Sequence, residues 1–492
     1  MNKMIIGIER YGAYLPKYLL ERKLIAEAWD FPVIPGGISV RNYDEDSITM
    51  AVEAGLDCLG EYDPNGIINT SSIDGLYFAT TTPPYTEKQC APIIANALDL
   101  RSDIICLDIT NSTKSMSLAL ARAYETIKAG KANKILIIGS DSQKPMPESM
   151  YEYQYGDGAA ALLIGKDEVV VSIEDYVSTS DNVIGPWKRA EDKFIRSFEG
   201  KHENIYGYSR NIIAAFKLLF EKTKIDPKSI AKAAIYALDP RNAEALAKKL
   251  GINSRAVENT PFLEFGNTGN AFAFMTLMLA LKRGKTGDLI AFGSYGDGAD
   301  AFLLKILDKQ KLRELRRKCR GIIGYKNSMV MLKNYGAYLS KKKIIETERF
   351  IRKSSPVRNW RDEKFLYRMY GMKCNKCGTI QYPIWRACIE CGEKDNKTDI
   401  KLKKRGKIFT FTLDHLEGGN YYDTPVPRCV IDLEGGGRIL LNMTDIENPQ
   451  ENVKIGMDVE MTFRFIHSGA NYNNYYWKCR PIRVLRKEEE EE

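Results

Sequence analysis

Four cysteines in the last third of the chain have the spacing of a metal site. They form two C-x2-C pairs, Cys374 with Cys377 and Cys388 with Cys391, and a glycine follows each pair. Glycine permits the tight turns that aim both sulfurs of a pair at one ion. Four thiolates fill a tetrahedral shell and leave no open position, so the pattern predicts a structural zinc ribbon. Spacing alone also allows an iron centre.

A second candidate for chemistry is the turn at residues 108–117, which reads Asp-Ile-Thr-Asn-Ser-Thr-Lys-Ser-Met-Ser. The apolar run at 104–107 predicts a buried strand before the turn, and apolar spacing at 118–127 predicts a helix after it. A strand that leads directly into a helix presents backbone N–H groups and the positive end of the helix dipole, which would stabilise a cysteine thiolate. The chain has Thr113 there, and threonine also suits a helix N-cap.

Groups that could activate Thr113 are scarce in the sequence. A threonine hydroxyl attacks a carbonyl only when an adjacent base takes its proton. The chain has three histidines, His202, His415 and His467. None is near Thr113 in sequence, and His202 lies in a charged run, 198–204, that is typical of an exposed loop. The residue pattern therefore favours a structural role for Thr113.

The elements that must position this turn follow an alternating pattern. From about residue 4 to 307, strands alternate with amphipathic helices, which predicts a layered α/β fold. The phrase Tyr-Gly-Asp-Gly-Ala occurs at 155–159 and again at 295–299, close to a predicted buried strand in each case. This internal repetition suggests a duplicated α/β half.

The remainder of the chain has a different character. Residues 309–318 predict a basic helix, and the aromatic residues that follow suggest that parts of this linker pack on a domain. Beyond the cysteines, short alternating strands with even spacing predict a small β-barrel of OB type. The expected segments are an α/β domain at 1–307, a basic and partly helical linker at 308–367, a zinc ribbon at 368–394, an OB-fold domain at 395–487 and an acidic tail at 488–492.

Composition limits the class of protein. The 492 residues are 44% hydrophobic and 28% charged, as in a globular protein. No apolar run approaches the roughly 18 residues that a membrane span needs, and the N-terminus lacks a signal-peptide pattern, so we expect a cytoplasmic protein. The formal charge of +8 is small for this length and does not by itself indicate nucleic-acid binding.

Three sequence phrases carry a resemblance to a known family. They are the turn at 108–117, Tyr-Gly-Asp-Gly-Ala-Ala-Ala at 155–161, and Glu-Phe-Gly-Asn-Thr-Gly-Asn-Ala at 264–271. With them, residues 4–307 resemble the thiolase superfamily, specifically 3-hydroxy-3-methylglutaryl-CoA synthase and ketoacyl synthase III-like proteins. The resemblance implies a five-layered, duplicated thiolase fold that is normally a dimer and binds acyl-CoA. The ribbon and barrel resemble the rubredoxin-like ribbon/OB family that accompanies thiolases and acyl-CoA enzymes.

The resemblance also assigns site residues. The synthases use a cysteine nucleophile, a glutamate base and a histidine, whose positions correspond here to Thr113, Thr81 and Leu238. Asn267 matches the asparagine that helps to polarise the thioester carbonyl. Three of the four positions therefore depart from the pattern. The residues expected beside a bound CoA thioester are Asn267, Gly296 and Gly298.

Three functions are compatible with these features. The first is a non-catalytic subunit that shapes an acyl-CoA site and bridges to a thiolase or acyltransferase subunit with the active cysteine, as a homodimer within a hetero-oligomer. The second is an enzyme, either a cysteine-independent aldolase or lyase or a divergent synthase-type acyltransferase. For an aldolase, the candidate proton bases are Tyr85, Tyr151, Tyr153 and Tyr155. The third, a single-stranded nucleic-acid-binding OB protein, is disfavoured because acidic residues interrupt any basic groove.

Overall fold

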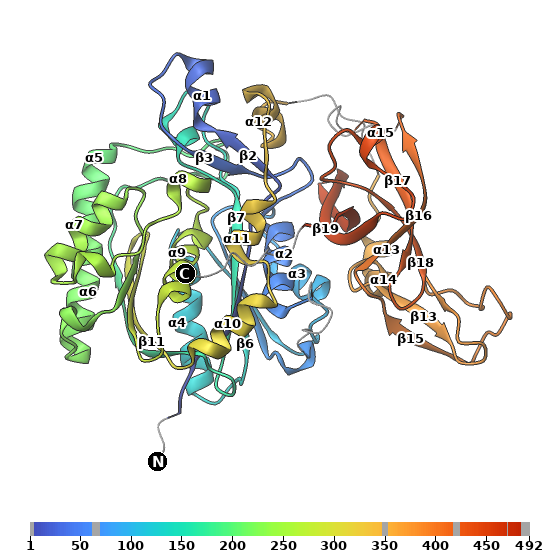
Figure 1. Cartoon of the computed structure of the whole chain (residues 1–492), viewed down its shortest axis with the longest axis horizontal. Coiled ribbons are helices and arrows are strands. Elements are labelled where there is room, and N and C mark those ends of the chain that lie inside the picture. Colours follow the sequence, from blue (N-terminus) through green and yellow to red (C-terminus); the bar gives the residue numbers. More distant parts are fainter. Residues whose placement is uncertain (1–3, 62–68, 347–352, 417–423, 470, 484–492) are drawn as a thin grey trace. The chain divides into compact units, whose positions relative to one another are not determined.

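The computed structural model describes residues 4–61, 69–346, 353–416, 424–469 and 471–483 (Figure 1). The chain divides into two compact units. The first comprises Met1–Ala95 and Leu100–Ile344, and the second comprises Asn96–Asp99 and Ile345–Val484. Within the described ranges, no helix combines the length and the apolar character that crossing a membrane requires.

A nine-stranded sheet forms the framework of the first unit. Its strands are β1 (Gly7–Tyr14), β4 (Gly75–Thr80), β5 (Ile105–Thr110), β6 (Ile135–Asp141), β7 (Gly158–Gly165), β8 (Val171–Ser180), β9 (Lys232–Ile235), β10 (Leu289–Tyr295) and β11 (Gly298–Ile306), in the spatial order β5-β4-β6-β7-β1-β8-β11-β10-β9. In one half, β4 runs parallel to β6 and β6 runs antiparallel to β7. In the other half, β9, β10 and β11 repeat this pattern. The two halves confirm the predicted duplication.

Helices on both faces of the two half-sheets complete five layers (Figure 1). Helix α2 (Ser47–Leu59) covers β1 and β7 on one outer face, and α6 (Arg210–Thr223) covers β8 and β11 on the other, with α7 (Pro240–Leu250) beside it. The central helices α4 (Ser115–Lys128) and α9 (Asn270–Arg283) contact strands of both halves and each other. Almost every side chain of α9 is buried, because a helix between two sheets has no solvent-facing side.

The other elements of the first unit are short. They are the strands β2 (Tyr18–Glu21), β3 (Gly37–Val40) and β12 (Val330–Met331), which form a small sheet in the order β12-β2-β3, and the helices α1 (Arg22–Trp29), α5 (Gly200–His202), α8 (Phe262–Phe265), α10 (Lys309–Arg317), α11 (Gly321–Asn327) and α12 (Tyr335–Lys341). A further helix, α3, spans Ala91–Ala97.

Residues 308–344 belong to the first unit, although the sequence suggested a linker over 308–367. Helices α10, α11 and α12 each bury an apolar or aromatic side chain, namely Leu312, Tyr325 and Tyr338. Strand β12 also pairs in parallel with β2. Several basic residues of this segment are buried as well, namely Arg316, Arg320, Lys341 and Lys342.

A buried ion pair fixes the end of this segment to the core. The Lys342 ammonium lies 2.6 Å from a carboxylate oxygen of Asp157, and the side chains are 1% and 0% exposed. The other oxygen of Asp157 accepts a hydrogen bond from the backbone N–H of Arg41 at 2.8 Å. Burial lowers the pKa of Lys342, and the charge of Asp157 opposes that shift. The first Tyr-Gly-Asp-Gly phrase therefore contributes an anchor in addition to a turn.

In the second unit, a small ribbon sheet carries the first pair of cysteines. Strands β13 (Tyr370–Cys374), β14 (Ile380–Gln381) and β15 (Lys397–Lys401) pair antiparallel in the order β14-β13-β15. Strand β15 lies in the range expected for the barrel but pairs with β13. Two short helices precede the ribbon, α13 (Pro356–Arg361) and α14 (Glu363–Leu366).

A five-stranded antiparallel sheet follows, as the alternation predicted. Its strands are β16 (Arg405–Asp414), β17 (Val426–Leu433), β18 (Arg438–Asn442), β19 (Asp458–Gly469) and β20 (Tyr472–Pro481), in the order β18-β17-β16-β19-β20, with α15 (Pro449–Asn452) between β18 and β19. A bridge between Met443 and Cys479 brings the end of β18 to β20 and closes the barrel. Tyr475 and Trp477 are buried and pack on Phe463, so they are not available to stack on bases.

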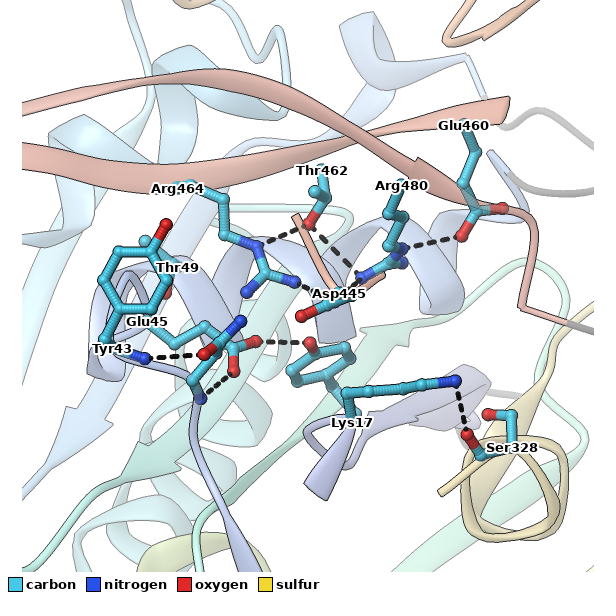
Figure 2. A network of polar contacts seen from close by, with 12 residues as sticks. Lys17, Tyr43, Glu45, Thr49, Ser328, Asp445, Glu460, Thr462, Arg464 and Arg480 are labelled. Atoms are coloured by element: carbon cyan, nitrogen blue, oxygen red, sulfur yellow. Dashed lines mark hydrogen bonds and ion pairs between the residues drawn. The ribbon is translucent and has the colours of Figure 1, made fainter. Parts of the chain in front are cut away.

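Buried side chains of opposite charge on β19, on β20 and after β18 form a network (Figure 2). Arg464 and Asp445 form an ion pair at 2.6 Å, and Arg480 and Glu460 form another at 2.8 Å. The Thr462 hydroxyl accepts hydrogen bonds from both guanidinium groups, at 3.0 and 3.3 Å. Because each buried arginine has a carboxylate partner, this network avoids the large cost of an unpaired buried charge.

Replacing Asp157 with asparagine tests the anchor. D157N leaves the Lys342 charge buried without a counter-charge, so we expect the free energy of unfolding to fall by about 3–5 kcal/mol. Chemical denaturation followed by circular dichroism measures this change. The control is E27Q, which removes an exposed pair with Lys23 on α1 and should cost less than about 0.5 kcal/mol. Equal effects of the two substitutions would show that the buried pair does not anchor the segment.

Candidate functional site

The turn between β5 and α4 is the strand-to-helix junction that the sequence predicted. Strand β5 ends at Thr110 and α4 begins at Ser115. The N-cap interpretation of Thr113 is wrong, because the N-cap position is Lys114 and no side chain caps the helix. The Thr113 hydroxyl instead donates a hydrogen bond to the backbone carbonyl of Tyr295 at 2.8 Å. Gly296 allows this approach, since an added Cβ there would lie 2.4 Å from Thr113 Oγ1.

Lys114, the residue after Thr113, directs its ammonium group to other partners. The Lys114 ammonium is buried and lies 3.0 Å from Asp300, and it also donates to the Thr179 carbonyl at 2.6 Å. The Ser117 hydroxyl donates to the second oxygen of Asp300. This network ties the start of α4 to β8 and β11, and it leaves Lys114 no role in activating the Thr113 hydroxyl.

Asp141, at the end of β6, organises the segments around the turn. Its Oδ1 accepts hydrogen bonds from the backbone N–H and the hydroxyl of Thr81, at 2.6 and 2.9 Å. Its Oδ2 accepts from the backbone and side-chain N–H groups of Asn270, at 2.8 and 2.9 Å. The Thr81 hydroxyl also accepts from the Gln143 amide at 2.6 Å. Thr81, at the predicted base position, is thus a neutral residue whose hydroxyl both donates and accepts a hydrogen bond.

Asn270 extends this network to the turn itself. Its side-chain oxygen accepts from the backbone N–H of Met116 at 3.0 Å, and its amide nitrogen donates to the Ser112 carbonyl at 3.2 Å. The first turn of α9 therefore holds the first turn of α4. The hydrogen-bonded chain from Thr81 through Asp141 and Asn270 to Ser112 links four segments of the sequence.

Asn267 is buried beside a tyrosine that the sequence interpretation did not single out. Its amide nitrogen donates to the Tyr236 hydroxyl at 3.1 Å, and its amide oxygen accepts from the Gly269 N–H at 3.0 Å. Its backbone forms a parallel bridge with Tyr155. Both polar atoms of the Asn267 side chain have partners, so the Tyr236 hydroxyl is the group that extends beyond Asn267 toward a cavity.

Gly296 and Gly298, the two glycines expected near CoA, lie at positions where a side chain would collide with neighbouring atoms. Gly298 has a φ of 117°, and an added Cβ would lie 2.1 Å from the Thr179 carbonyl oxygen. Gly296 lies against Thr113 as described above. Packing alone accounts for both glycines, and their contact with CoA stays a prediction.

A cavity of about 580 Å³ lies next to the turn. Tyr295, whose carbonyl binds Thr113, contributes its side chain to the wall, and so does Leu238 at the predicted histidine position. The lining residues are Ser149, Met150, Tyr151, Gln154, Ser197, Gly200, Glu203, Asn204, Tyr208, Tyr236, Leu238, Asn242 and Tyr295. This volume lies within the range of small-molecule sites.

Aromatic rings form one wall of the cavity. The rings of Tyr208, Tyr236 and Tyr295 contact one another with centroid separations of 5.4 to 6.1 Å. Burial raises the pKa of all three hydroxyls, which keeps them protonated. Burial also raises the pKa of the Glu203 carboxyl to about 7. The cavity thus combines neutral hydroxyl donors with one carboxyl group that titrates near neutral pH.

Neither a thiol nor an imidazole lines this cavity. All ten cysteines are described, and none is among its lining residues. Cys106 and Cys90 are the cysteines that precede Thr113 most closely in the sequence, and burial raises the pKa of both thiols. His202 ends the short helix α5 and does not lie in an exposed loop, and its ring contacts that of Tyr206 at an angle of 41°, outside the lining.

Two cavity residues escaped the sequence interpretation. Glu203 was part of the charged run assigned to an exposed loop, and it begins a π-helical stretch, Glu203–Ser209, that leads into α6. Tyr236 follows β9 at the position two before Leu238. Of the four tyrosines considered as bases, Tyr151 lines the cavity and Tyr85, Tyr153 and Tyr155 do not. The helical periodicity of α6 continues back into the charged run, and this pattern could have indicated that Glu203 lies on a helix.

The four cysteines of the second unit converge as predicted. Their sulfur atoms all lie within 4.8 Å of one another, with Cys374 and Cys391 at 3.6 Å and Cys377 and Cys388 at 3.5 Å. The Cys377 sulfur forms a hydrogen bond with the Thr379 side chain at 3.2 Å, and this contact lowers the pKa of Cys377. The arrangement fits a zinc ribbon.

Comparisons with protein families match both units. The model for 3-oxoacyl-[acyl-carrier-protein] synthase III matches residues 107–182, and the model for the C-terminal OB-fold domain of ChsH2 matches residues 399–464. These matches lie on the β5–α4 turn with the strands that follow it, and on the barrel. They agree with the thiolase-like fold and the OB-fold described above.

Relatives extend the match over most of the first unit. A hydroxymethylglutaryl-CoA synthase from Pyrobaculum arsenaticum is 30% identical over 322 residues, which are 63% of this chain and 90% of that protein. The synthase from Methanobrevibacter smithii is 30% identical over 336 residues, 65% of this chain and 95% of that protein. A solved structure of MvaS in complex with 3-hydroxy-3-methylglutaryl coenzyme A superposes with a TM-score of 0.63 at 16% identity, over 71% of this chain and 95% of that one.

Proposed function

The chain belongs to the hydroxymethylglutaryl-CoA synthase family, and we propose that it binds an acyl-CoA thioester without forming an acyl-enzyme. It would act as one component of a complex that makes or breaks C–C bonds in acyl-CoA thioesters. A separate thiolase-type subunit would supply the nucleophilic cysteine. The observation that carries this proposal is the Thr113 hydroxyl, which is at the predicted nucleophile position and donates a hydrogen bond to the Tyr295 carbonyl.

The chemistry around Thr113 supports this assignment. A hydroxyl becomes a nucleophile when a base accepts its proton, and a backbone carbonyl is not such a base. The residue at the glutamate position is Thr81, a neutral side chain bound to Asp141 and Gln143. The residue at the histidine position is the apolar Leu238. Nucleophile, base and acid are therefore replaced together, whereas the scaffold that holds the turn is intact.

A CoA thioester is the ligand that the site would accept. The solved structure with the same fold contains 3-hydroxy-3-methylglutaryl coenzyme A. The cavity beside Thr113 is large enough for an acyl group, and its wall is aromatic and polar. Asn267, Gly296 and Gly298 are the residues proposed to lie near the thioester.

The exposed edge of the nine-stranded sheet supports assembly. Strand β5 is at the end of the strand order, and its residues are half-buried or exposed, including the apolar Ile105 at 43%. Unpaired backbone groups on an edge strand can pair with a strand of another chain. We assign this edge to a homodimer contact. The ribbon and barrel would then bind the cysteine-bearing subunit, with covalent attachment keeping the modules at high local concentration.

We assign the metal of the four-cysteine cluster as structural zinc. Cys374, Cys377, Cys388 and Cys391 would each supply one thiolate, which completes a tetrahedral shell. A zinc ion held this way has no open position for substrate or water. Its contribution is therefore to the folding of the ribbon and not to a reaction step.

Metal analysis of the purified chain tests the zinc assignment. We expect about one zinc ion per chain by inductively coupled plasma mass spectrometry. C377S should lose that zinc, because three thiolates bind far more weakly than four. The matched control is C106S, a half-buried cysteine of the first unit, which should keep the wild-type stoichiometry. Iron in place of zinc, or full zinc content in C377S, would contradict the assignment.

Acylation of the isolated chain and of the T113A variant tests the proposed function. We expect intact-mass spectrometry to show no covalent acyl group after incubation of the isolated wild-type chain with acetyl-CoA. T113A should bind acetyl-CoA within about twofold of wild type and should support the same activity in the assembled complex, because this hydroxyl performs no acyl transfer. An acylated Thr113, or complete loss of complex activity in T113A, would refute the proposal.

A further inference from the structure

Glu203 is a half-buried carboxyl group that the acyl-transfer machinery of the family does not include. It lines the cavity from the start of the π-helical stretch Glu203–Ser209. Its carboxyl group has no hydrogen bond or ion pair with any residue that the structure describes. π-Helical turns are rare and occur frequently at functional sites. An acid that lines a cavity and has no partner is available to a ligand.

The groups that face Glu203 are hydroxyls. Burial raises the pKa of four tyrosines, and the charge of Glu203 raises it further: Tyr151 before the π-helical stretch, Tyr155 before β7, Tyr236 after β9 and Tyr295 at the end of β10. The charged groups of the neighbouring elements are satisfied or exposed. Lys201 on α5 is exposed, Arg210 on α6 pairs with Asp181, and Asp300 on β11 pairs with Lys114. Among the residues that the structure describes, no cation offsets the effect of burial on the pKa of this carboxyl group.

Tyr236 supplies the complementary donor. Its hydroxyl oxygen accepts the hydrogen bond from the Asn267 amide at 3.1 Å, so its own hydrogen is free to point into the cavity. A hydroxyl that accepts one hydrogen bond donates another more strongly. Because the Asn267 amide is bound to Tyr236, the Tyr236 hydroxyl and not the amide would polarise the carbonyl group of a ligand. Any carbonyl oxygen in the cavity would meet a neutral, preorganised donor.

We propose that this cavity catalyses proton transfer at the carbon adjacent to the carbonyl of a bound CoA thioester, with Glu203 as the base and Tyr236 as the hydrogen-bond donor to the developing enolate. The inference rests on the proposed binding of acyl-CoA. The C–H bond breaks, the proton passes to a carboxylate oxygen of Glu203, and the electron pair forms the C=C bond of the enolate. The former carbonyl oxygen carries the negative charge and accepts the hydrogen bond from Tyr236. Reprotonation by Glu203 closes the cycle without a thiolate.

The cavity also indicates the class of acyl group. The rings of Tyr208, Tyr236 and Tyr295 form a continuous aromatic wall, and Met150 and Leu238 add apolar surface. A volume of about 580 Å³ exceeds what an acetyl group fills. An aryl-substituted acyl group with a hydrogen on the carbon next to the carbonyl matches this wall, because aromatic rings pack favourably edge to face.

Deuterium exchange into phenylacetyl-CoA tests the proposal on the full chain. We expect wild type to incorporate deuterium from D₂O at this carbon faster than the enzyme-free solution, measured by mass spectrometry. E203Q should slow the enzyme-dependent rate by about 100-fold or more. Y236F should slow it by a factor of roughly 10 to 100 while binding is retained. The matched control is E199Q, an exposed carboxylate one turn before Glu203, which should exchange like wild type.

The pH profile and the stability of E203Q distinguish catalysis from a structural role. Since the base form of Glu203 is required and its pKa is about 7, the exchange rate should rise with pH through about 7 and then level off. At pH 8 the wild-type carboxylate is ionised in a half-buried position, so the neutral amide of E203Q should raise the thermal midpoint while it abolishes exchange. If Glu203 had only a structural role, E203Q would lower both the thermal midpoint and the exchange rate.

Binding measured separately keeps the two proposals distinct. Calorimetric titration with phenylacetyl-CoA reports binding without any reaction. Binding together with absent exchange, or equal exchange in wild type and E203Q, overturns the role of Glu203 and leaves the acyl-CoA-binding proposal intact. Absence of binding to both acetyl-CoA and phenylacetyl-CoA overturns both proposals.

Discussion

The carboxylate of Asp141 is the constraint on which the site depends. It is buried, and it accepts hydrogen bonds from Thr81 after β4 and from Asn270 at the start of α9. Asn270 in turn binds Ser112 and Met116 in the turn that begins α4. One anion at the end of β6 thus sets the relative positions of two parallel strands and two central helices. The donors to the Asp141 carboxylate are neutral N–H and O–H groups of Thr81 and Asn270. The arrangement of these segments therefore does not require reactive residues beside them.

This constraint explains how the fold would keep its shape without a cysteine nucleophile, as we propose. The Thr113 hydroxyl donates a hydrogen bond to the Tyr295 carbonyl, and Gly296 provides the space for that contact. Thr81 fits the Asp141 network as a neutral donor, and Leu238 adds apolar wall to the cavity. All three residues are therefore hydrogen-bonded or packed in their surroundings. Glu203 is the carboxyl group that lines the cavity.

The sequence predicted the features that depend on local pattern. The four cysteines, the strand–turn–helix around Thr113 and the duplicated glycine phrases all appeared as expected, because turns and short spacings are set by neighbouring residues. The packing of residues 308–344 was expected in part, because the aromatic residues among the basic ones suggested that the segment packs on a domain, and Tyr325 and Tyr338 are buried. Glu203 was missed because its burial depends on the end of β10 and the segment after β9, which are remote in sequence. Likewise, the contact between Asn267 and Tyr236 joins residues whose spacing carries no signal.

The location of the acyl group in the assembled complex tests the central claim most directly. The chain would be purified with its cysteine-bearing partner, mixed with radiolabelled acyl-CoA, quenched in acid and digested, and the labelled peptide identified by mass spectrometry. The account predicts that the label is on a cysteine of the partner and that no peptide of this chain carries it. A labelled peptide spanning residues 108–117 of this chain would contradict the account.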